Sequence, residues 1–215
     1  MILDGYSFEI PYQIISRKTL TKLNISGLVN LKRLDYVYNF ANLFSFDLSS
    51  NVNLTVLGCS ENQLTSIDFL NSLPNPDKLE ILEIYDNNIQ PTTLDFLKSF
   101  ANLKSCKLGE NVMKESKELQ NRLQSKTYNK FYGSLEPIKN LTKLENFCIA
   151  GTDINEGLEY ISTKIAQSSS EAVKKGYNPI TMNLIDCQPL RNDAKVVQIQ
   201  GQLRPFNHDN IVNNP

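Results

Sequence analysis

One nine-residue phrase recurs along the chain, with Leu at its first position, an apolar residue at its fourth and sixth positions, and Asn at its ninth. Its clearest copies are LTVLGCSEN, from Leu54 to Asn62, and LEILEIYDN, from Leu79 to Asn87. A phrase repeated at nearly constant spacing indicates an array of stacked units, and it argues against one closed globule around a central pocket. The phrase therefore constrains the architecture much more tightly than the function.

Five copies of the phrase can be aligned. They begin at Leu31, Leu54, Leu79, Leu103 and Leu144. Successive starts lie 23, 25, 24 and 41 residues apart, which fits a unit of about 20–29 residues with one insertion in the last step. Shorter matches open at Leu20 and Leu43, midway between main copies, so the early units are expected to be apolar on both the strand side and the return side.

The alternation within the phrase predicts a strand. Residues two apart in a strand point to the same side, so the leucines face a core and the residues between them face solvent or a partner. The phrase resembles the leucine-rich repeat over about residues 20–155. The resemblance implies an α/β fold: a leucine-rich repeat solenoid, or horseshoe, with a short parallel sheet on its concave face and turns and short helices on its convex face.

The return segments are less regular than the strands. Leu94, Leu97 and Phe100 have the three-residue spacing of a short helix. The equivalent stretch of the preceding unit is broken at Pro74 and Pro76. We expect short helices or turns on this side.

Asparagine closes four of the five copies, and Thr152 stands in its place in the fifth. An unpaired amide in a tight bend is costly, but a side-chain amide can bond backbone groups of its own turn and of the next coil. The sequence therefore predicts a structural column of asparagines that joins neighbouring coils. Its expected members are Asn39, Asn62, Asn87 and Asn111.

The phrase also divides the chain into a repeat domain and its flanks. The expected segments are an N-terminal flank or truncated cap at 1–19, the leucine-rich repeat domain at 20–188, a C-terminal capping helix at 189–205 and a flexible tail at 206–215. Apolar residues from Val196 to Leu203 recur at helical spacing before Pro205. Such a helix would cover the open apolar end of the last coil.

Charge and composition exclude some partners. The formal net charge is −1 and the pI is about 5.9, so the chain lacks the basic field that holds nucleic acid or an anionic membrane. The N-terminus has no pattern of a secretory signal, and no segment has the roughly 18 apolar residues of a membrane span. We expect a cytoplasmic protein.

No residue pattern indicates catalysis, a cofactor or a metal. The four cysteines include no CxxC pair, and Cys59 and Cys106 stand where other copies have a core residue, which favours a reducing compartment. His208 is the only histidine and lies in the polar tail. The common nucleophile, zinc, dinucleotide and phosphate motifs are missing. The chain is expected not to be an enzyme.

The residues between the leucines are the best candidates for function. Those expected to bind a partner are Arg33, Asp35, Val56, Ile81, Glu83, Tyr85, Lys107 and Asn146. Val56, Ile81 and Tyr85 form an apolar centre with charges around it, which is the anatomy of a protein-binding patch. The ordinary alternative is that these are solvated strand residues favoured for their β propensity. The sequence predicts a monomeric, non-catalytic module that binds a protein or peptide. The module could be the recognition arm of a larger protein. Its loosely spaced repeats resemble those found beside kinase-like domains in some fungal proteins.

A second function is compatible with the insertion in the 41-residue step, at about 114–131. Leu119 and Leu123 lie four residues apart in it, among charged residues, which predicts a surface helix. The alternative is then a structural scaffold that self-associates through this insertion.

Overall fold

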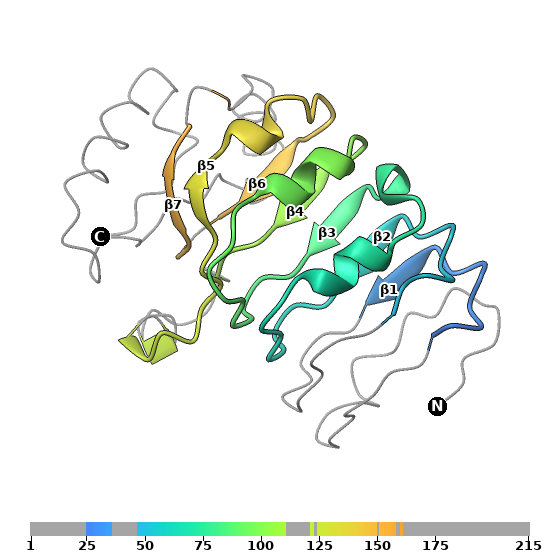
Figure 1. Cartoon of the computed structure of the whole chain (residues 1–215), viewed down its shortest axis with the longest axis horizontal. Coiled ribbons are helices and arrows are strands. Elements are labelled where there is room, and N and C mark those ends of the chain that lie inside the picture. The colour runs from blue at the N-terminus through green and yellow to red at the C-terminus, as the bar shows by residue number, and fades with distance from the viewer. Residues whose placement is uncertain are drawn as a thin grey trace, which may run out of the picture.

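The computed structural model describes residues 25–35, 47–110, 121–122, 124–149, 151–157 and 160. Over these residues the chain winds into successive coils whose strands lie in one row (Figure 1). Several predictions lie outside the described residues. These are the N-terminal flank at 1–19, the capping helix at 189–205, the tail at 206–215, and the positions of Asn39, Leu119, Leu123 and His208.

Five short strands form the main parallel sheet. In spatial order they are β1 (Arg33–Asp35), β2 (Val56–Gly58), β3 (Ile81–Glu83), β4 (Ser105–Lys107) and β6 (Asn146–Cys148). Each strand is the middle of one copy of the repeated phrase, and each coil is named here by its strand. The register pairs equal positions of the phrase throughout, from Leu34 with Leu57 to Cys106 with Phe147. The predicted parallel sheet is confirmed.

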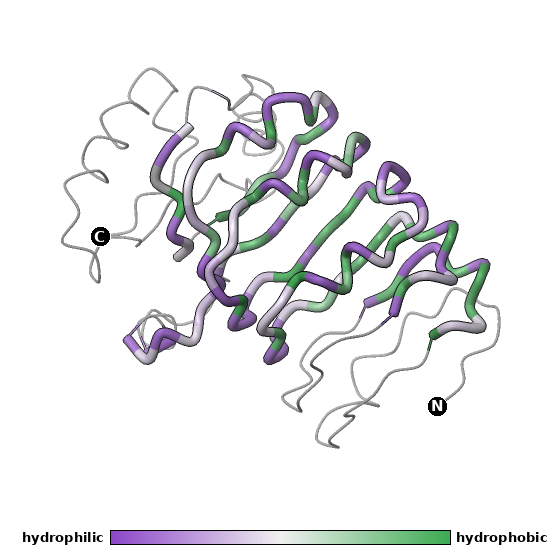
Figure 2. Tube along the Cα trace, viewed as in Figure 1, coloured by the Kyte–Doolittle hydropathy of each residue, from purple (hydrophilic) through white to green (hydrophobic). Residues whose placement is uncertain are grey.

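The core lies on one face of this sheet. The central residues of the strands are all buried: Leu34, Leu57, Leu82, Cys106 and Phe147. Figure 2 shows hydrophobic residues recurring along the strands of successive coils. Cys59 and Cys106 are 0% exposed and act as small apolar residues, and burial raises the pKa of both thiols.

Short 3-10 helices line the return side of the coils (Figure 1). They are η1 (Asp68–Ser72), η2 (Pro76–Lys78), η3 (Asp95–Ser99) and η4 (Glu136–Ile138). A 3-10 helix has three residues per turn, so side chains three apart share one side. Leu94, Leu97 and Phe100 follow this spacing around η3 and all are buried. The curvature of a horseshoe stays a prediction.

A second, smaller sheet follows the turn that the asparagines occupy. Strand β5 (Tyr132–Ser134) pairs in parallel with β7 (Asp153–Glu156), and Thr92 bridges to Phe131 beside them. This sheet was not predicted from the sequence. Its strands lie outside the repeated phrase, so no recurring alternation marks them, and backbone pairing between neighbouring coils forms it.

Candidate partner-binding surface

The face of the main sheet opposite the core, called the strand face below, carries two registered rows of side chains. The first row is Arg33, Val56, Ile81, Ser105 and Asn146, and the second is Asp35, Gly58, Glu83, Lys107 and Cys148. Seven of the eight predicted partner-binding residues stand in these rows. The eighth, Tyr85, lies two residues beyond Glu83 along the β3 coil. Arg33 is exposed and the other seven are half-buried.

The charges of the strand face are combined in ion pairs. Arg33 pairs with Asp35 in the β1 coil. The Nζ atom of Lys107 lies 2.7 Å from Oε1 of Glu83 and 6.0 Å from the centre of the Tyr85 ring. The sequence predicted charges around the apolar centre. In the structure these charges pair with one another, so both signs of charge lie close together on the strand face.

The strand face is not level. Ile81, Glu83 and Tyr85 of the β3 coil are large and half-buried. The adjacent β2 coil has Gly58 and the fully buried Ser60, and the β4 coil has Ser105, which is 8% exposed. A Cβ atom on Gly58 would lie 2.5 Å from Oδ1 of Asp35, so this carboxylate covers the glycine. Ile81 is larger than its partners Val56 and Ser105, and Glu83 is larger than Gly58, whereas Lys107 of β4 is as long as Glu83. Ile81, Glu83 and Tyr85 are together called the β3 ridge below.

Some positions expected to face outward are closed off. Ser60, Ser105 and Cys148 are at most 9% exposed, although the alternation puts them on the strand face. The Sγ atom of Cys148 in β6 lies 4.0 Å from the carbonyl oxygen of Glu110, which follows the adjacent strand β4. Strand alternation alone could not predict this burial, because small side chains are covered by larger neighbours from adjacent coils.

The predicted asparagine column is present. Asn87 Nδ2 donates to the carbonyl oxygens of Ile84 and, in the preceding coil, Cys59, both at 3.0 Å. Its Oδ1 accepts from the backbone N–H of Leu64 at 3.0 Å. Asn62 Nδ2 donates within its own turn to the carbonyl oxygen of Cys59 at 2.9 Å. These amides satisfy buried backbone groups, so they are structural residues.

In the β4 coil, Asn129 and not Asn111 takes this position. Asn129 Nδ2 donates to the carbonyl oxygens of Ile84 at 2.8 Å and Leu108 at 2.7 Å, and its Oδ1 accepts from the N–H of Ile89 at 3.1 Å. This is the pattern of Asn87 moved by one coil. Asn111, which was predicted for this position, lies outside the described residues.

The position of Asn129 also corrects the end of the insertion. Phe131, predicted to belong to the insertion, is 0% exposed and follows Asn129 as Ile89 follows Asn87. Residues 129–131 belong to the repeat, and the insertion lies between Glu110 and Asn129. The triplet Asn-x-apolar, seen at 62–64 and 87–89, is the signal that would have found this boundary.

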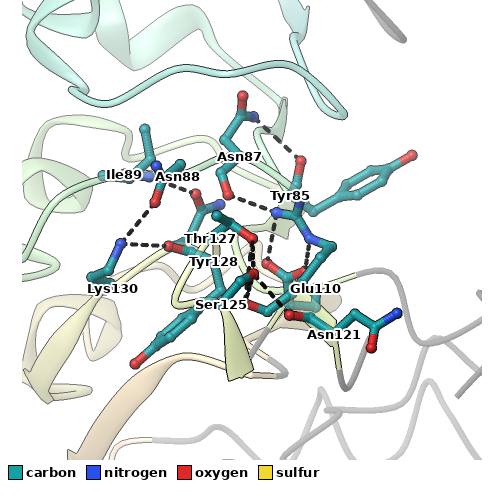
Figure 3. A network of polar contacts seen from close by, with 12 residues as sticks. Tyr85, Asn87, Asn88, Ile89, Glu110, Asn121, Ser125, Thr127, Tyr128 and Lys130 are labelled. Atoms are coloured by element: carbon teal, nitrogen blue, oxygen red, sulfur yellow. Dashed lines mark hydrogen bonds and ion pairs between the residues drawn. The ribbon is translucent and has the colours of Figure 1, made fainter. Parts of the chain in front are cut away.

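The insertion contacts the repeat where the half-buried Arg122 meets the buried Glu110, a contact that was not predicted from the sequence. Glu110 is 1% exposed, and Arg122 Nε donates to its Oε2 at 2.5 Å, while Arg122 Nη2 donates to its Oε1 at 3.3 Å. The same Nη2 donates to the carbonyl oxygen of Asn87 at 2.7 Å. Figure 3 shows Glu110 and Asn87 in this network. Burial raises the pKa of the Glu110 carboxyl to about 8, with Arg122 opposing the rise and Asp86 adding to it.

The other end of the insertion is also held by polar contacts. Tyr128 Oη donates to Oδ1 of Asp153 at 3.0 Å. Lys130 Nζ donates to Oδ1 of Asn88 at 2.7 Å and lies 5.3 Å from the centre of the Tyr128 ring. Burial lowers the pKa of the Lys130 ammonium. These contacts join the β3, β4 and β6 coils beside the asparagine column (Figure 3).

Among the described residues, no group of three or more His, Cys, Asp or Glu residues is placed to hold a metal ion. The same part of the chain has no helix with the length and apolar character needed to cross a membrane.

Comparisons with known proteins give one family match. Residues 52–105 match the model described as Leucine Rich repeats (2 copies). No curated protein sequence matches the chain. Among solved structures, the LRR ectodomain of the receptor kinase SOBIR1 from Arabidopsis thaliana aligns with 23% identity over 57% of this chain and 57% of that ectodomain, with a TM-score of 0.40. At that identity and TM-score the likeness carries no inference about partner or location.

Proposed function

We propose that this chain, whose residues 52–105 match a leucine-rich repeat model, is a non-catalytic module that binds a protein or peptide on its strand face. Leucine-rich repeats commonly serve protein–protein interaction, because stacked coils create an extended surface whose side chains vary without changing the frame. The frame of this chain consists of the leucines and asparagines. Its variable surface consists of the two rows of the strand face.

The β3 ridge is the observation that carries this proposal. Tyr85 supplies an aromatic side chain, Ile81 an apolar one, and the Glu83–Lys107 pair lies beside them. Aromatic side chains next to polar groups dominate binding energy at protein interfaces, while the surrounding residues exclude water. A half-exposed ion pair contributes little to folding, so its charges are available to a partner.

The proposal includes a monomeric protein in a reducing, cytoplasmic location. The support for the reducing location is that Cys59 and Cys106 are buried thiols outside any disulfide. A sedimentation measurement checks the first point, since a concentration-dependent dimer contradicts it. Localisation of the native protein by microscopy checks the second.

The test compares two double variants in affinity capture from the native cell. Tyr85→Ala with Glu83→Lys alters the β3 ridge. The matched control is Tyr132→Ala with Asp77→Lys, which removes a tyrosine that is 45% exposed and reverses an exposed charge away from the strand face. Proteins captured by the wild type and the control but lost with the ridge variant support the proposal. If both variants capture the same proteins, the strand face is not the binding site.

A further inference from the structure

The part of the insertion nearest the repeat is bonded to three different coils. This part, residues 121–122 and 124–128, is called the insertion root below. Arg122 bonds the carbonyl oxygen of Asn87 in the β3 coil and the carboxylate of Glu110 in the β4 coil. Tyr128 bonds Asp153, which follows β6. A loop that only reconnects the chain needs none of these contacts, so the insertion root has a defined place on the molecule.

Arg122 is the strongest of these anchors. Its guanidinium makes two bonds to Glu110 and one to a backbone carbonyl. The geometry of a guanidinium fork is fixed, and bonds from a charged donor are stronger than neutral ones. Because Glu110 is buried from solvent, the loss of Arg122 would leave its carboxyl group without its main hydrogen-bonding partner and without water to replace it.

Short bonds within the insertion root transmit this anchor to its neighbours. The backbone N–H of Ser125 donates to the carbonyl oxygen of Asn121 at 2.9 Å, and that of Thr127 donates to the carbonyl oxygen of Arg122 at 2.9 Å. The Ser125 hydroxyl donates to the carbonyl oxygen of Asn121 at 2.8 Å. Figure 3 shows Asn121, Ser125 and Thr127 beside Glu110. Fixing Arg122 therefore fixes the turn that follows it.

The insertion root lies at the end of the strand face where Tyr85 stands. Arg122 bonds Asn87, and Asn87 Nδ2 in turn donates to the carbonyl oxygen of Tyr85 at 3.3 Å. Tyr85 and Glu110 lie in the same network in Figure 3. The exposed side chains of the root are polar: Asn121, Gln124, Ser125 and Lys126.

We propose that Arg122 is a positioning residue that holds the insertion root as a polar wall at the Tyr85 end of the strand face, so that a protein partner lying on the β3 ridge also contacts the root. The contact with a partner rests on the proposed function; the anchoring does not. The part of the partner that meets this wall is a polar protein surface, since hydrogen-bonding side chains of the root face it.

Hydrogen exchange tests the anchoring in the free protein. In Arg122→Ala we expect the amides of Ser125 and Thr127 to exchange about tenfold faster, because a bond to a charged donor of this kind is lost. The amides of Ile84 and Asp86, bonded to Lys107 and Gly109, should keep their rates. The control Lys126→Ala removes one positive charge from the same segment at an exposed position and should change the rates less than about twofold. Unchanged rates at Ser125 and Thr127 in Arg122→Ala overturn the proposal.

A second variant is needed if Arg122→Ala speeds amide exchange throughout the repeat. Arg122→Lys keeps a positive charge beside Glu110 but cannot make the forked contact. Faster exchange confined to Ser125 and Thr127 supports the anchoring. Exchange equal to the wild type in this variant overturns it.

The partner contact is tested with the protein captured by the ridge comparison. Arg122→Ala should weaken its binding about tenfold, while Lys139→Ala, an exposed cation on the return side, should not. Equal binding by Arg122→Ala and wild type overturns the contact. If the ridge comparison yields no protein that depends on the β3 ridge, the strand-face function fails, while the hydrogen-exchange rates still decide the anchoring by Arg122.

Discussion

The β3 coil and the β4 coil are built from the same phrase but reach their asparagine by different routes. In the β3 coil Asn87 directly follows Asp86 at the end of the phrase. In the β4 coil the insertion separates Glu110 from Asn129, which nevertheless makes the same set of hydrogen bonds. Each coil therefore keeps an asparagine amide at the same place in space, although the number of residues between the strand and that asparagine differs.

The difference has a physical reason. Each coil must satisfy buried carbonyl and N–H groups at the turn, and an unpaired group there is costly. A long surface loop adds little entropy cost to the fold. An insertion is therefore tolerated at this point of the coil, provided that an asparagine follows it.

Phe131→Ala should have the largest effect, and it tests where the β4 coil resumes. Phe131 is 0% exposed, and truncating a buried Phe costs about 3–5 kcal/mol. The control Tyr132→Ala removes a neighbouring ring that is 45% exposed and should cost less than about 1 kcal/mol. Urea unfolding measures both. A cost for Phe131→Ala as small as that of Tyr132→Ala would show that the insertion continues through residue 131.

Asn129→Ala and Asn87→Ala should come next, and they test whether the two amides are equivalent. Each truncation removes at least three hydrogen bonds to buried backbone groups, at a cost of about 2–4 kcal/mol. Asn111→Ala should cost much less. The free energies of unfolding of the three variants decide between Asn129 and Asn111. A large cost for Asn111→Ala with a small one for Asn129→Ala contradicts the equivalence.

Much of the frame was predictable because one phrase encodes it repeatedly. The strands, their register and the inward direction of Leu34, Leu57 and Leu82 all follow from an alternation that recurs in every coil. The column role of Asn87 follows from its place in a tight turn. Repetition makes these features visible, since a chance pattern does not recur at a constant period.

The contacts of the insertion could not be predicted in the same way. Arg122 and Glu110 are twelve positions apart, occur once, and meet only because the coil brings Asn87 and Glu110 together. A single occurrence gives no period, so the Arg122–Glu110 pair needs the structure. The Glu83–Lys107 pair is different, because both residues hold the fifth position of the phrase in adjacent coils, and the repeat alone brings them side by side.

The stability of the β4 coil, which contains the insertion, should depend on pH through Glu110. The folded chain holds the carboxyl proton of Glu110 up to a pKa of about 8, whereas the unfolded chain releases it near the ordinary value of 4.5. Between these values the folded chain binds more protons, so its stability falls as pH rises through the window.

The variant Glu110→Gln isolates this effect, because glutamine keeps an acceptor for Arg122 and does not titrate. We expect the wild type to lose at least about 1 kcal/mol more than Glu110→Gln between pH 5 and pH 8.5. Thermal unfolding at several pH values measures the difference, and Glu80→Gln, at a half-buried pair on the β3 coil, serves as the control. Parallel pH curves for wild type and Glu110→Gln would contradict the raised pKa.

The smallest expected effect concerns the strand face, where the β3 and β4 coils meet. The side chains of Lys107 and Glu83 are each 29% exposed, and an ion pair that solvent reaches contributes about 0.2–1 kcal/mol. A double-mutant cycle with Lys107→Ala and Glu83→Ala, measured by urea unfolding, should give a coupling energy in this range. A coupling well above it would mean that the pair is part of the frame. A small coupling means that Lys107 and Glu83 can each leave the other and pair with a group of a partner. The Arg122–Glu110 pair, whose carboxyl is buried, is expected to differ in this respect.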